Sequence, residues 1–412
     1  MSPATNAASR AAGALLGLAA LLVACSPEPN VVHEYDAYAG DAFPDRLQPV
    51  TYPAAGAIVV TDSYSDTLSL VDLGTGERFA SFPVGRDPVS IDGPHHLAVN
   101  VAARRLFTAL SYPVLATGGP HASHGSSVQA GYAQVLSLDD FRILGQVRVD
   151  NNPGDIVLSE DGKRLVVSHF DLVRALENAG DLDKQRATLA IIDPSTLEQP
   201  VPPAPPRIDV CIAPHAVALS RPDAARAYVA CNGEDSIAVV DLDAAKVLER
   251  IPVAAGASAQ GNPQYGPYSA VLSPDGKTLA IGNQVSRDVS FLDIETMAMM
   301  PERTLSTQGT PFFPAWSADG NTLYVTTQTP NAVLAIDFSA DNAELERRDF
   351  AAGECDLPHV AEIQGDALLV VCEGDHVAPG RVLFLEPDTL TTRHTTEVGV
   401  YPDAMARVGG AR

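Results

Sequence analysis

Short runs of apolar residues alternate with polar turns along most of the chain, and the same succession recurs many times. The clearest unit is Pro267–Glu295 (PYSAVLSPDGKTLAIGNQVSRDVSFLDIE), which predicts a strand, an Asp-Gly turn, a second strand, a polar loop and a third strand. Asp-Gly between two apolar runs supplies the positive φ that a tight hairpin needs. The strands are rich in Val, Leu, Ile and Ala, as is typical of strands buried on both faces of a sheet. The pattern therefore predicts an all-β chain built from repeated antiparallel units.

Six complete units open with a proline just before their first, inner strand: Pro94, Pro153, Pro214, Pro267, Pro311 and Pro358. The segment Ala57–Gly85 lacks such an inner strand, whereas Pro402–Val408 is an inner strand without the other three. We expect these two segments to pair and form one further blade, because this pairing closes the ring and removes free sheet edges. The sequence therefore predicts a seven-bladed β-propeller over residues 54–412.

The order of residues within the units carries a family resemblance. The succession "VG…P…LSPDGK", together with second strands such as LYVTTQ and AYVACN, resembles the YVTN-type seven-bladed β-propeller repeat. The resemblance spans the chain after residue 53. It implies the fold, and repeats of this class say little about activity.

The first 25 residues resemble a bacterial lipoprotein signal peptide. An apolar run at Ala11–Ala24 is too short for a comfortable membrane span and ends in Leu-Val-Ala-Cys, which resembles a lipobox. The resemblance implies that Cys25 is lipidated and becomes the first residue of the mature protein. A plain secretory signal with an incidental cysteine is the alternative.

The residues after Cys25 bear on where such a lipoprotein would reside. Ser26 follows the cysteine, and in this signal class a residue other than Asp favours the outer membrane. Residues 26–53 are polar and dotted with proline, and are predicted to form a tether. We expect a monomer anchored to the membrane by lipid in a Gram-negative-type cell envelope, either periplasmic or surface-exposed.

Charge and cysteine content narrow the partners and the compartment. The formal net charge of −24 and the pI near 4.6 argue against a nucleic-acid partner, because polyphosphate would be repelled. Of five cysteines, four remain after Cys25, an even number that suits an oxidising compartment. Each pair flanks one predicted hairpin, so we predict the disulfides Cys211–Cys231 and Cys355–Cys372. A Cys/His metal centre is the competing interpretation.

Histidines gather on one face of the predicted ring, the face where the inner strands begin, here called the top face. The long insertions Ser111–Gln134 and His169–Thr188 map to the same face. Three histidines directly follow an inner-strand proline and are expected around the channel mouth. With neighbours they form a candidate copper or zinc site of His95, His96, His215, His359 and Asp403. Further top-face loop candidates are His121, His124, His169, His376 and Tyr268. The alternative is that each imidazole caps backbone groups or fills space beneath the loops.

The sequence leaves three functions open. A covalent haem motif, a nucleophile elbow, a phosphate loop and a His-Glu-x-x-His motif are all absent. GPHHLAVN at residues 93–100 resembles the propeller lactonases of the 6-phosphogluconolactonase type, although that family's motif has arginine where His95 stands. The favoured hypothesis is a non-catalytic platform that binds a protein or small molecule through its top face. A metal-binding or redox-accessory protein and a lactonase-type hydrolase, in which His96 is required, are the alternatives.

Overall fold

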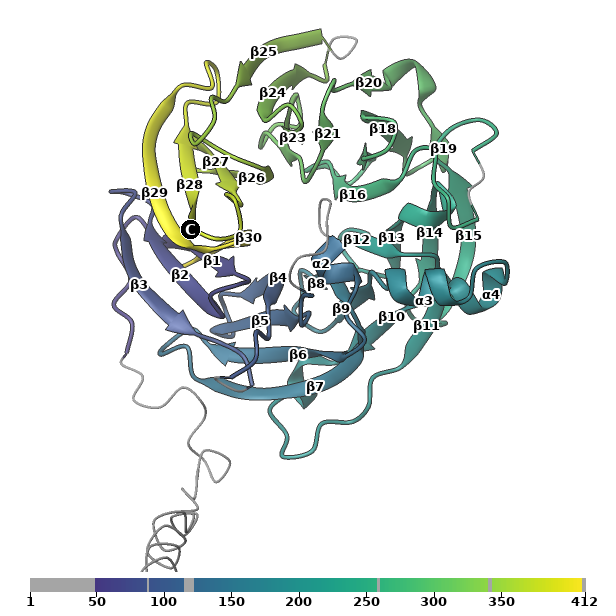
Figure 1. Cartoon of the computed structure of the whole chain (residues 1–412), viewed down its shortest axis with the longest axis horizontal. Coiled ribbons are helices and arrows are strands. Elements are labelled where there is room, and N and C mark those ends of the chain that lie inside the picture. The colour runs from purple at the N-terminus through teal and green to yellow at the C-terminus, as the bar shows by residue number, and fades with distance from the viewer. Residues whose placement is uncertain (1–48, 87–88, 115–121, 258–259, 340–342, 410–412) are drawn as a thin grey trace, which may run out of the picture. The chain divides into compact units, whose positions relative to one another are not determined.

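The computed structural model describes residues 49–86, 89–114, 122–257, 260–339 and 343–409. Within these ranges the chain forms seven antiparallel sheets arranged in a ring (Figure 1). The predicted all-β, seven-bladed propeller is thus confirmed. Cys25, the tether up to residue 48 and His121 lie outside the described residues.

The first three blades come from the two ends of the chain and its first half. Blade 1 contains β30 (Pro402–Val408), β1 (Ala57–Asp62), β2 (Thr67–Asp72) and β3 (Arg78–Pro83). Blade 2 contains β4 (Pro94–Asn100), β5 (Arg105–Leu110), β6 (Ala130–Ser137) and β7 (Ile143–Asn151). Blade 3 contains β8 (Pro153–Leu158), β9 (Leu165–His169), β10 (Ala187–Ile192) and β11 (Arg207–Cys211). β30 pairs with β1, with Ala57 opposite Val408, so strands from both ends of the chain share one sheet.

The remaining four blades follow in chain order. Blade 4 contains β12 (Pro214–Leu219), β13 (Arg226–Cys231), β14 (Ser236–Asp241) and β15 (Lys246–Pro252). Blade 5 contains β16 (Pro267–Leu272), β17 (Thr278–Asn283), β18 (Asp288–Asp293), β19 (Ala298–Met299) and β20 (Leu305–Ser306). Blade 6 contains β21 (Thr310–Pro311), β22 (Ala315–Trp316), β23 (Thr322–Gln328), β24 (Ala332–Asp337) and β25 (Ala343–Asp349). Blade 7 contains β26 (Pro358–Gln364), β27 (Ala367–Cys372), β28 (Pro379–Leu385) and β29 (Thr392–Val400).

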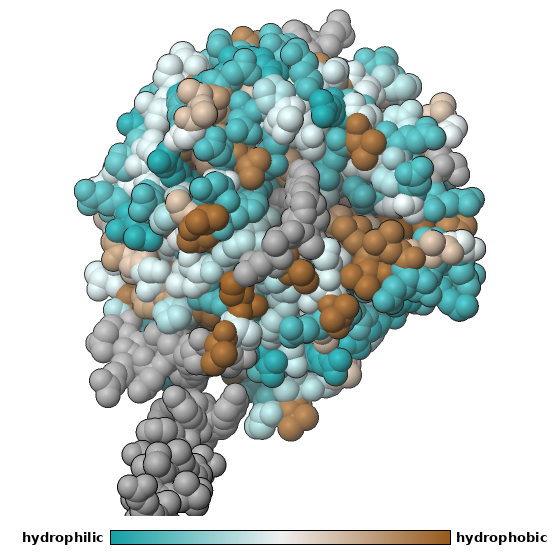
Figure 2. All heavy atoms as spheres, viewed as in Figure 1, coloured by the Kyte–Doolittle hydropathy of each residue, from teal (hydrophilic) through white to brown (hydrophobic). Residues whose placement is uncertain are grey.

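Short helices occupy the inserted segments. They are α2 (Ala122–Gly125), α3 (Leu172–Glu177) and α4 (Leu182–Gln185), with 3₁₀ turns at Pro194–Thr196, Asn232–Glu234 and Pro301–Arg303. Among the described residues, every helix is too short or too polar to cross a membrane. The surface in Figure 2 mixes polar and apolar residues, and the exposed large hydrophobics, Val128, Leu176 and Val285 among them, belong to different blades.

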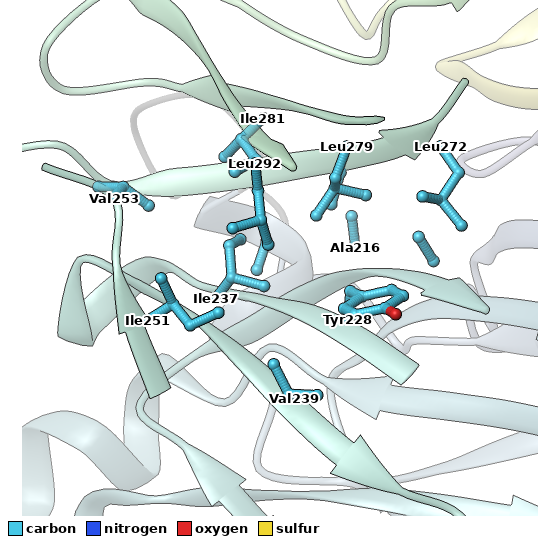
Figure 3. Packing of buried hydrophobic residues seen from close by; sticks show 13 residues of the cluster. Ala216, Tyr228, Ile237, Val239, Ile251, Val253, Leu272, Leu279, Ile281 and Leu292 are labelled. Atoms are coloured by element: carbon cyan, nitrogen blue, oxygen red, sulfur yellow. The ribbon is translucent and has the colours of Figure 1, made fainter. Parts of the chain in front are cut away.

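The core lies between neighbouring blades. Figure 3 shows the layer between blades 4 and 5, where Tyr228, Ile237, Leu279 and Leu292 interdigitate. Leu279 and Leu292 are fully buried. Each fully buried side chain of this kind contributes roughly 1.5–3 kcal/mol relative to leaving it exposed. Because the sheets pack on both faces, central strands such as β17 and β18 are buried almost throughout, which is the pattern seen in the sequence. Outermost strands such as β3 and β15 are largely exposed.

A repeated polar network fixes the inner hairpins. In blade 5 the Ser273 hydroxyl donates to Asp275 Oδ1 (2.6 Å) and accepts from the Thr278 amide (3.0 Å). Gly276 takes the positive φ of the turn, at 71°. The same arrangement recurs in blade 3 at Ser159 and in blade 6 at Ser317. The Asp-Gly turns of the sequence therefore position the start of each second strand.

The structure forms both predicted disulfides, Cys211–Cys231 and Cys355–Cys372. Their Cα atoms lie 5.8 and 5.1 Å apart. The first cysteine of each pair reaches its partner because the residue before the inner-strand proline adopts a left-handed backbone, Ala213 at φ 51° and Leu357 at φ 53°. The second bridge links the segment before β26 to the end of β27, both at blade 7. Cys211, by contrast, ends β11 of blade 3 and Cys231 ends β13 of blade 4, so the first bridge joins two neighbouring blades and not the two ends of one hairpin.

Candidate functional site

Five imidazoles and one carboxylate meet where the inner strands begin. His95 and His96 come from β4, His215 from β12, His359 from β26 and Asp403 from β30, and His124 comes from α2. These six side chains are named the histidine cluster. The ring centroid of His95 lies 4.4 Å from that of His96, 4.2 Å from that of His124 and 5.8 Å from that of His215. All six residues are buried.

A β-bulge at the start of the inner strands places these residues. In β4 the register with β5 shifts between Pro94 and Leu97, so His95 and His96 lie within the irregularity. Register shifts follow Pro153, Pro214 and Pro358 in the same way. A bulge re-aims side chains that would otherwise alternate between opposite faces of the sheet. Both His95 and His96 therefore join one cluster although they are consecutive.

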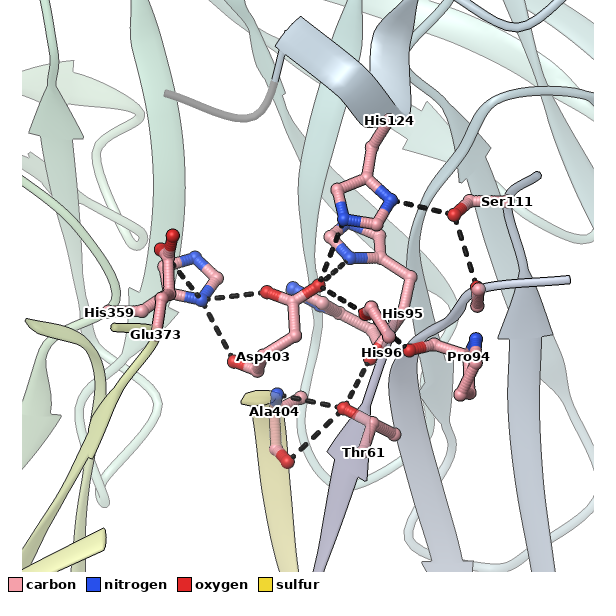
Figure 4. Close-up of polar contacts among 12 residues, drawn as sticks. Thr61, Pro94, His95, His96, Ser111, His124, His359, Glu373, Asp403 and Ala404 are labelled. Atoms are coloured by element: carbon pink, nitrogen blue, oxygen red, sulfur yellow. Dashed lines mark hydrogen bonds and ion pairs between the residues drawn. The ribbon is translucent and has the colours of Figure 1, made fainter. Parts of the chain in front are cut away.

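Asp403 links the two sides of the cluster (Figure 4). His95 contacts Asp403 Oδ2 through Nδ1, and His359 Nδ1 lies 2.8 Å from Asp403 Oδ1 on the other side. His124 Nε2 lies 3.6 Å from Asp403 Oδ2. Burial alone would raise the pKa of Asp403, but the adjacent His95 and His359 imidazoles hold it well below its ordinary value. Burial alone would lower the pKa of His359, yet Asp403 and Glu373 raise it. Asp403 is thus held as a carboxylate.

His96 is oriented by a different carboxylate. Its Nδ1 lies 2.8 Å from Asp155 Oδ1. Asp155 is itself fixed, because its Oδ2 accepts from the Val217 amide at 2.9 Å and its Oδ1 from the Ile156 amide at 2.8 Å. A carboxylate at Nδ1 selects the tautomer that carries its proton there, which leaves the lone pair on Nε2. Nε2 is buried and makes no hydrogen bond within the described part of the chain.

One member of the cluster, His96, lines a cavity that residues of several inner strands enclose. This cavity of about 420 Å³ is lined at one end by His96, Asp155 and Phe313, and at the other by Glu160 and Arg221 near the hairpin turns. The Phe313 ring packs edge-on against His96, with centroids 4.9 Å apart. The volume lies within the range of about 300–1,000 Å³ that is usual for small-molecule sites. His96 and Asp155 are therefore the polar groups at one end of a space large enough for a small ring compound.

The structure brings together all five residues of the candidate metal site, His95, His96, His215, His359 and Asp403. It adds His124, which the sequence assigns only to a top-face loop. It also adds Asp155 and Phe313, which the sequence analysis missed. The sequence does contain a pattern that could have identified these two residues. Each is the second residue after an inner-strand proline, the same position that His96 has in its blade.

Other top-face candidates have structural roles. His169 is the last residue of β9, and Tyr268 is a buried residue of β16, so assigning either to a top-face loop is wrong. The His169 Nδ1–H donates to the Thr188 carbonyl (2.8 Å), and Nε2 accepts from the Asp150 amide (3.1 Å). Tyr268 stacks on His215 with centroids 3.6 Å apart. His376 does lie in a loop, where it stacks on Tyr401 at 3.7 Å.

Solved structures share this fold at low sequence identity. Periplasmic gluconolactonase from Pseudomonas aeruginosa matches with a TM-score of 0.60 and 17% identity over 86% of this chain and 99% of its own. A putative 6-phosphogluconolactonase from Bacteroides uniformis matches with a TM-score of 0.60 and 13% identity over 86% and 100%. Hydrazine synthase of Kuenenia stuttgartiensis matches with a TM-score of 0.55 and 20% identity over 74% and 81%. Identities this low support the fold alone.

A family model decides between the functional hypotheses. No curated protein sequence matches this chain. The family model described as "Lactonase, 7-bladed beta-propeller" matches residues 90–379, which is more than half of the chain. This match overturns the favoured hypothesis of a non-catalytic binding platform and supports the lactonase alternative instead. The chain belongs to the lactonase family of seven-bladed β-propellers.

Proposed function

We propose that this protein hydrolyses a lactone or a closely related cyclic ester in its central channel. Membership of the lactonase family supports the reaction class. The observation that carries the proposal is His96 at one end of the cavity, with Nδ1 held by Asp155 at 2.8 Å and Nε2 without a hydrogen-bond partner among the described residues.

The chemistry follows from this pair. His96 Nε2 takes a proton from a water molecule in the cavity, and the resulting hydroxide attacks the carbonyl carbon of the lactone. The ring C–O bond of the tetrahedral intermediate then breaks, and the leaving oxygen takes the proton back from the imidazolium. Asp155 stabilises that imidazolium and keeps the ring in position, as a carboxylate behind a catalytic histidine does. The product is the open-chain hydroxy acid.

The environment of the pair suits this role. His96 is only 5% exposed and Phe313 covers one edge of its ring, so bulk water is held away from the reacting groups. Electrostatic stabilisation of a developing charge is larger in such a site than in water. The apolar strand residues of the cavity wall, such as Val157 and Leu219, would contact the carbon skeleton of the substrate.

The test is turnover of a panel of aldonolactones and simple lactones by the full chain, with the spontaneous rate subtracted. We expect His96→Gln and Asp155→Asn to lower kcat/KM by about 10²–10⁴-fold. His169→Gln is the matched control, because it removes a buried imidazole outside the cavity and should leave kcat/KM unchanged. The proposal fails if no lactone is turned over, or if His96→Gln retains the wild-type rate.

We also propose that Cys25 carries a lipid and anchors the protein to the outer membrane. The support is the Leu-Val-Ala-Cys sequence after an apolar run, followed by Ser26. Cells producing the full chain should incorporate labelled palmitate into it, and Cys25→Ala should abolish the label and release the protein from the membrane fraction. Equal labelling of the two forms would contradict the anchor.

A further inference from the structure

The histidine cluster contains a set of donors suited to a transition metal. One ring nitrogen from each of His95, His96 and His215 lies within 4.8 Å of the other two. The three residues are fully or almost fully buried. They come from blades 2 and 4, which the ring brings together across the top of the channel.

Packing alone does not account for this arrangement. A polar group buried without a hydrogen bond costs roughly 1–3 kcal/mol in proteins. His96 Nε2 is such a group. The other ring nitrogen, Nδ1, is hydrogen-bonded to Asp155, and no group in the described residues forms a hydrogen bond with Nε2. A metal ion would satisfy that lone pair, because imidazole binds both zinc and copper well.

The neighbours of these imidazoles resemble the outer shell of a metal site. Asp155 stands behind His96, and Asp403 stands behind His95, each at the Nδ1 atom. Metal-ligating histidines commonly donate their second nitrogen to a carboxylate in this way, which fixes the ring and raises its basicity. Tyr268 holds the plane of the His215 ring by stacking at 3.6 Å.

We propose that His95, His96 and His215 bind one copper or zinc ion, with His95 and His96 coordinating through Nε2. At a bond length of about 2.0–2.1 Å, nitrogens in a tetrahedral site lie about 3.3–3.4 Å from one another, so the three rings move closer together on binding. Three imidazoles are the protein ligands of some catalytic zinc sites, whereas structural zinc sites have four protein ligands.

This inference goes beyond the proposed hydrolysis and does not rest on it. An ion held here takes the lone pair of His96 that would otherwise activate water, so the attacking water would then be activated by the ion. Ion binding is measured without substrate. A lack of lactone turnover therefore leaves the ion site standing, and a lack of ion leaves the hydrolysis standing.

The experiment is elemental analysis of the full chain, purified in detergent without chelator and without a polyhistidine tag. We expect about one copper or zinc per chain. After chelation, titration with Zn²⁺ and with Cu²⁺ in separate arms should restore the ion. His215→Gln should weaken the binding at least about 100-fold. His169→Gln, the control for a buried imidazole with backbone partners, should bind as the wild type does.

Two results would overturn the site. One is a folded wild-type chain that neither retains nor takes up either ion. The other is a His215→Gln variant that keeps wild-type affinity and a wild-type circular dichroism spectrum. If that variant does not fold, electron paramagnetic resonance of the wild-type chain loaded with Cu²⁺ decides the question. Hyperfine splitting from three imidazole nitrogens supports the donor set, and splitting from fewer contradicts it.

Discussion

His95 and His96 are neighbours in β4, yet their rings lie 4.4 Å apart, centroid to centroid, in the same buried cluster. Consecutive residues of a regular strand point to opposite sides of the sheet. The bulge between Pro94 and Leu97 removes that constraint, so His95 reaches Asp403 while His96 reaches Asp155. One irregular step of the backbone thus serves both the proposed hydrolysis and the proposed ion site.

Stability should depend on pH through His169. Burial lowers the pKa of His169 from 6.5 to about 4. The folded state therefore binds the proton more weakly than the unfolded state. The stabilisation is present above pH 6.5 and is lost as the pH falls towards 4, by about 3 kcal/mol in total. His169→Gln keeps one donor and one acceptor and should flatten this part of the profile. The measurement is urea unfolding at several pH values, and an unchanged profile would contradict the assignment.

Gly93 should be essential for its turn. It has φ +64°, and a Cβ there would lie 2.3 Å from Cδ of Pro113. Gly365 has nearly the same φ, +65°, with no atom within 4 Å of a Cβ. We expect Gly365→Ala to cost about 1–2 kcal/mol from backbone strain alone. Gly93→Ala should cost more, because the clash is added. Equal free energies of unfolding for the two variants would show that the close approach to Pro113 is relieved without cost.

Each disulfide should stabilise the fold by a similar amount. The bridges close segments of 20 and 17 residues, which corresponds to about 3 kcal/mol each in the loop-entropy model. The double variant Cys355→Ser/Cys372→Ser should lose about that much stability, and dithiothreitol should then lower its stability further by breaking only the remaining bridge. A double variant as stable as the oxidised wild type would exclude a stabilising role.

The layer between blades should tolerate truncation poorly. Leu292 is fully buried between blades 4 and 5, whereas Leu248 in β15 is 44% exposed. Leu292→Ala should cost about 2–5 kcal/mol, because it leaves a cavity among fixed neighbours. Leu248→Ala, the same change at the surface, should cost less than about 1 kcal/mol. Thermal denaturation of the two variants measures the difference. Similar losses of stability would show that burial of Leu292 between blades 4 and 5 contributes no more than a surface leucine does.

The lactonase assignment shows where residue patterns are weak. GPHHLAVN carries a resemblance to propeller lactonases over eight residues only, and His95 departs from that motif. The family match instead covers residues 90–379, which span most of the ring. A short motif says little about function when its fold hosts many activities.

The local pattern by itself determined the blades and the disulfides of this protein. Asp-Gly turns such as Asp275-Gly276 and apolar strands such as β13 are formed by neighbouring residues, and the two cysteines of each pair are only 20 and 17 residues apart along the chain. Tertiary structure alone decided that the His124 ring stacks on His95 and that Asp155 orients His96. It also decided that both ring nitrogens of His169 are hydrogen-bonded, one to Thr188 and one to Asp150. Those contacts depend on bulges and on the approach of separate blades, which no spacing along the chain records. The physical reason is that turns and hairpins are set by adjacent residues, whereas a site on the ring axis is set by the closure of the whole ring.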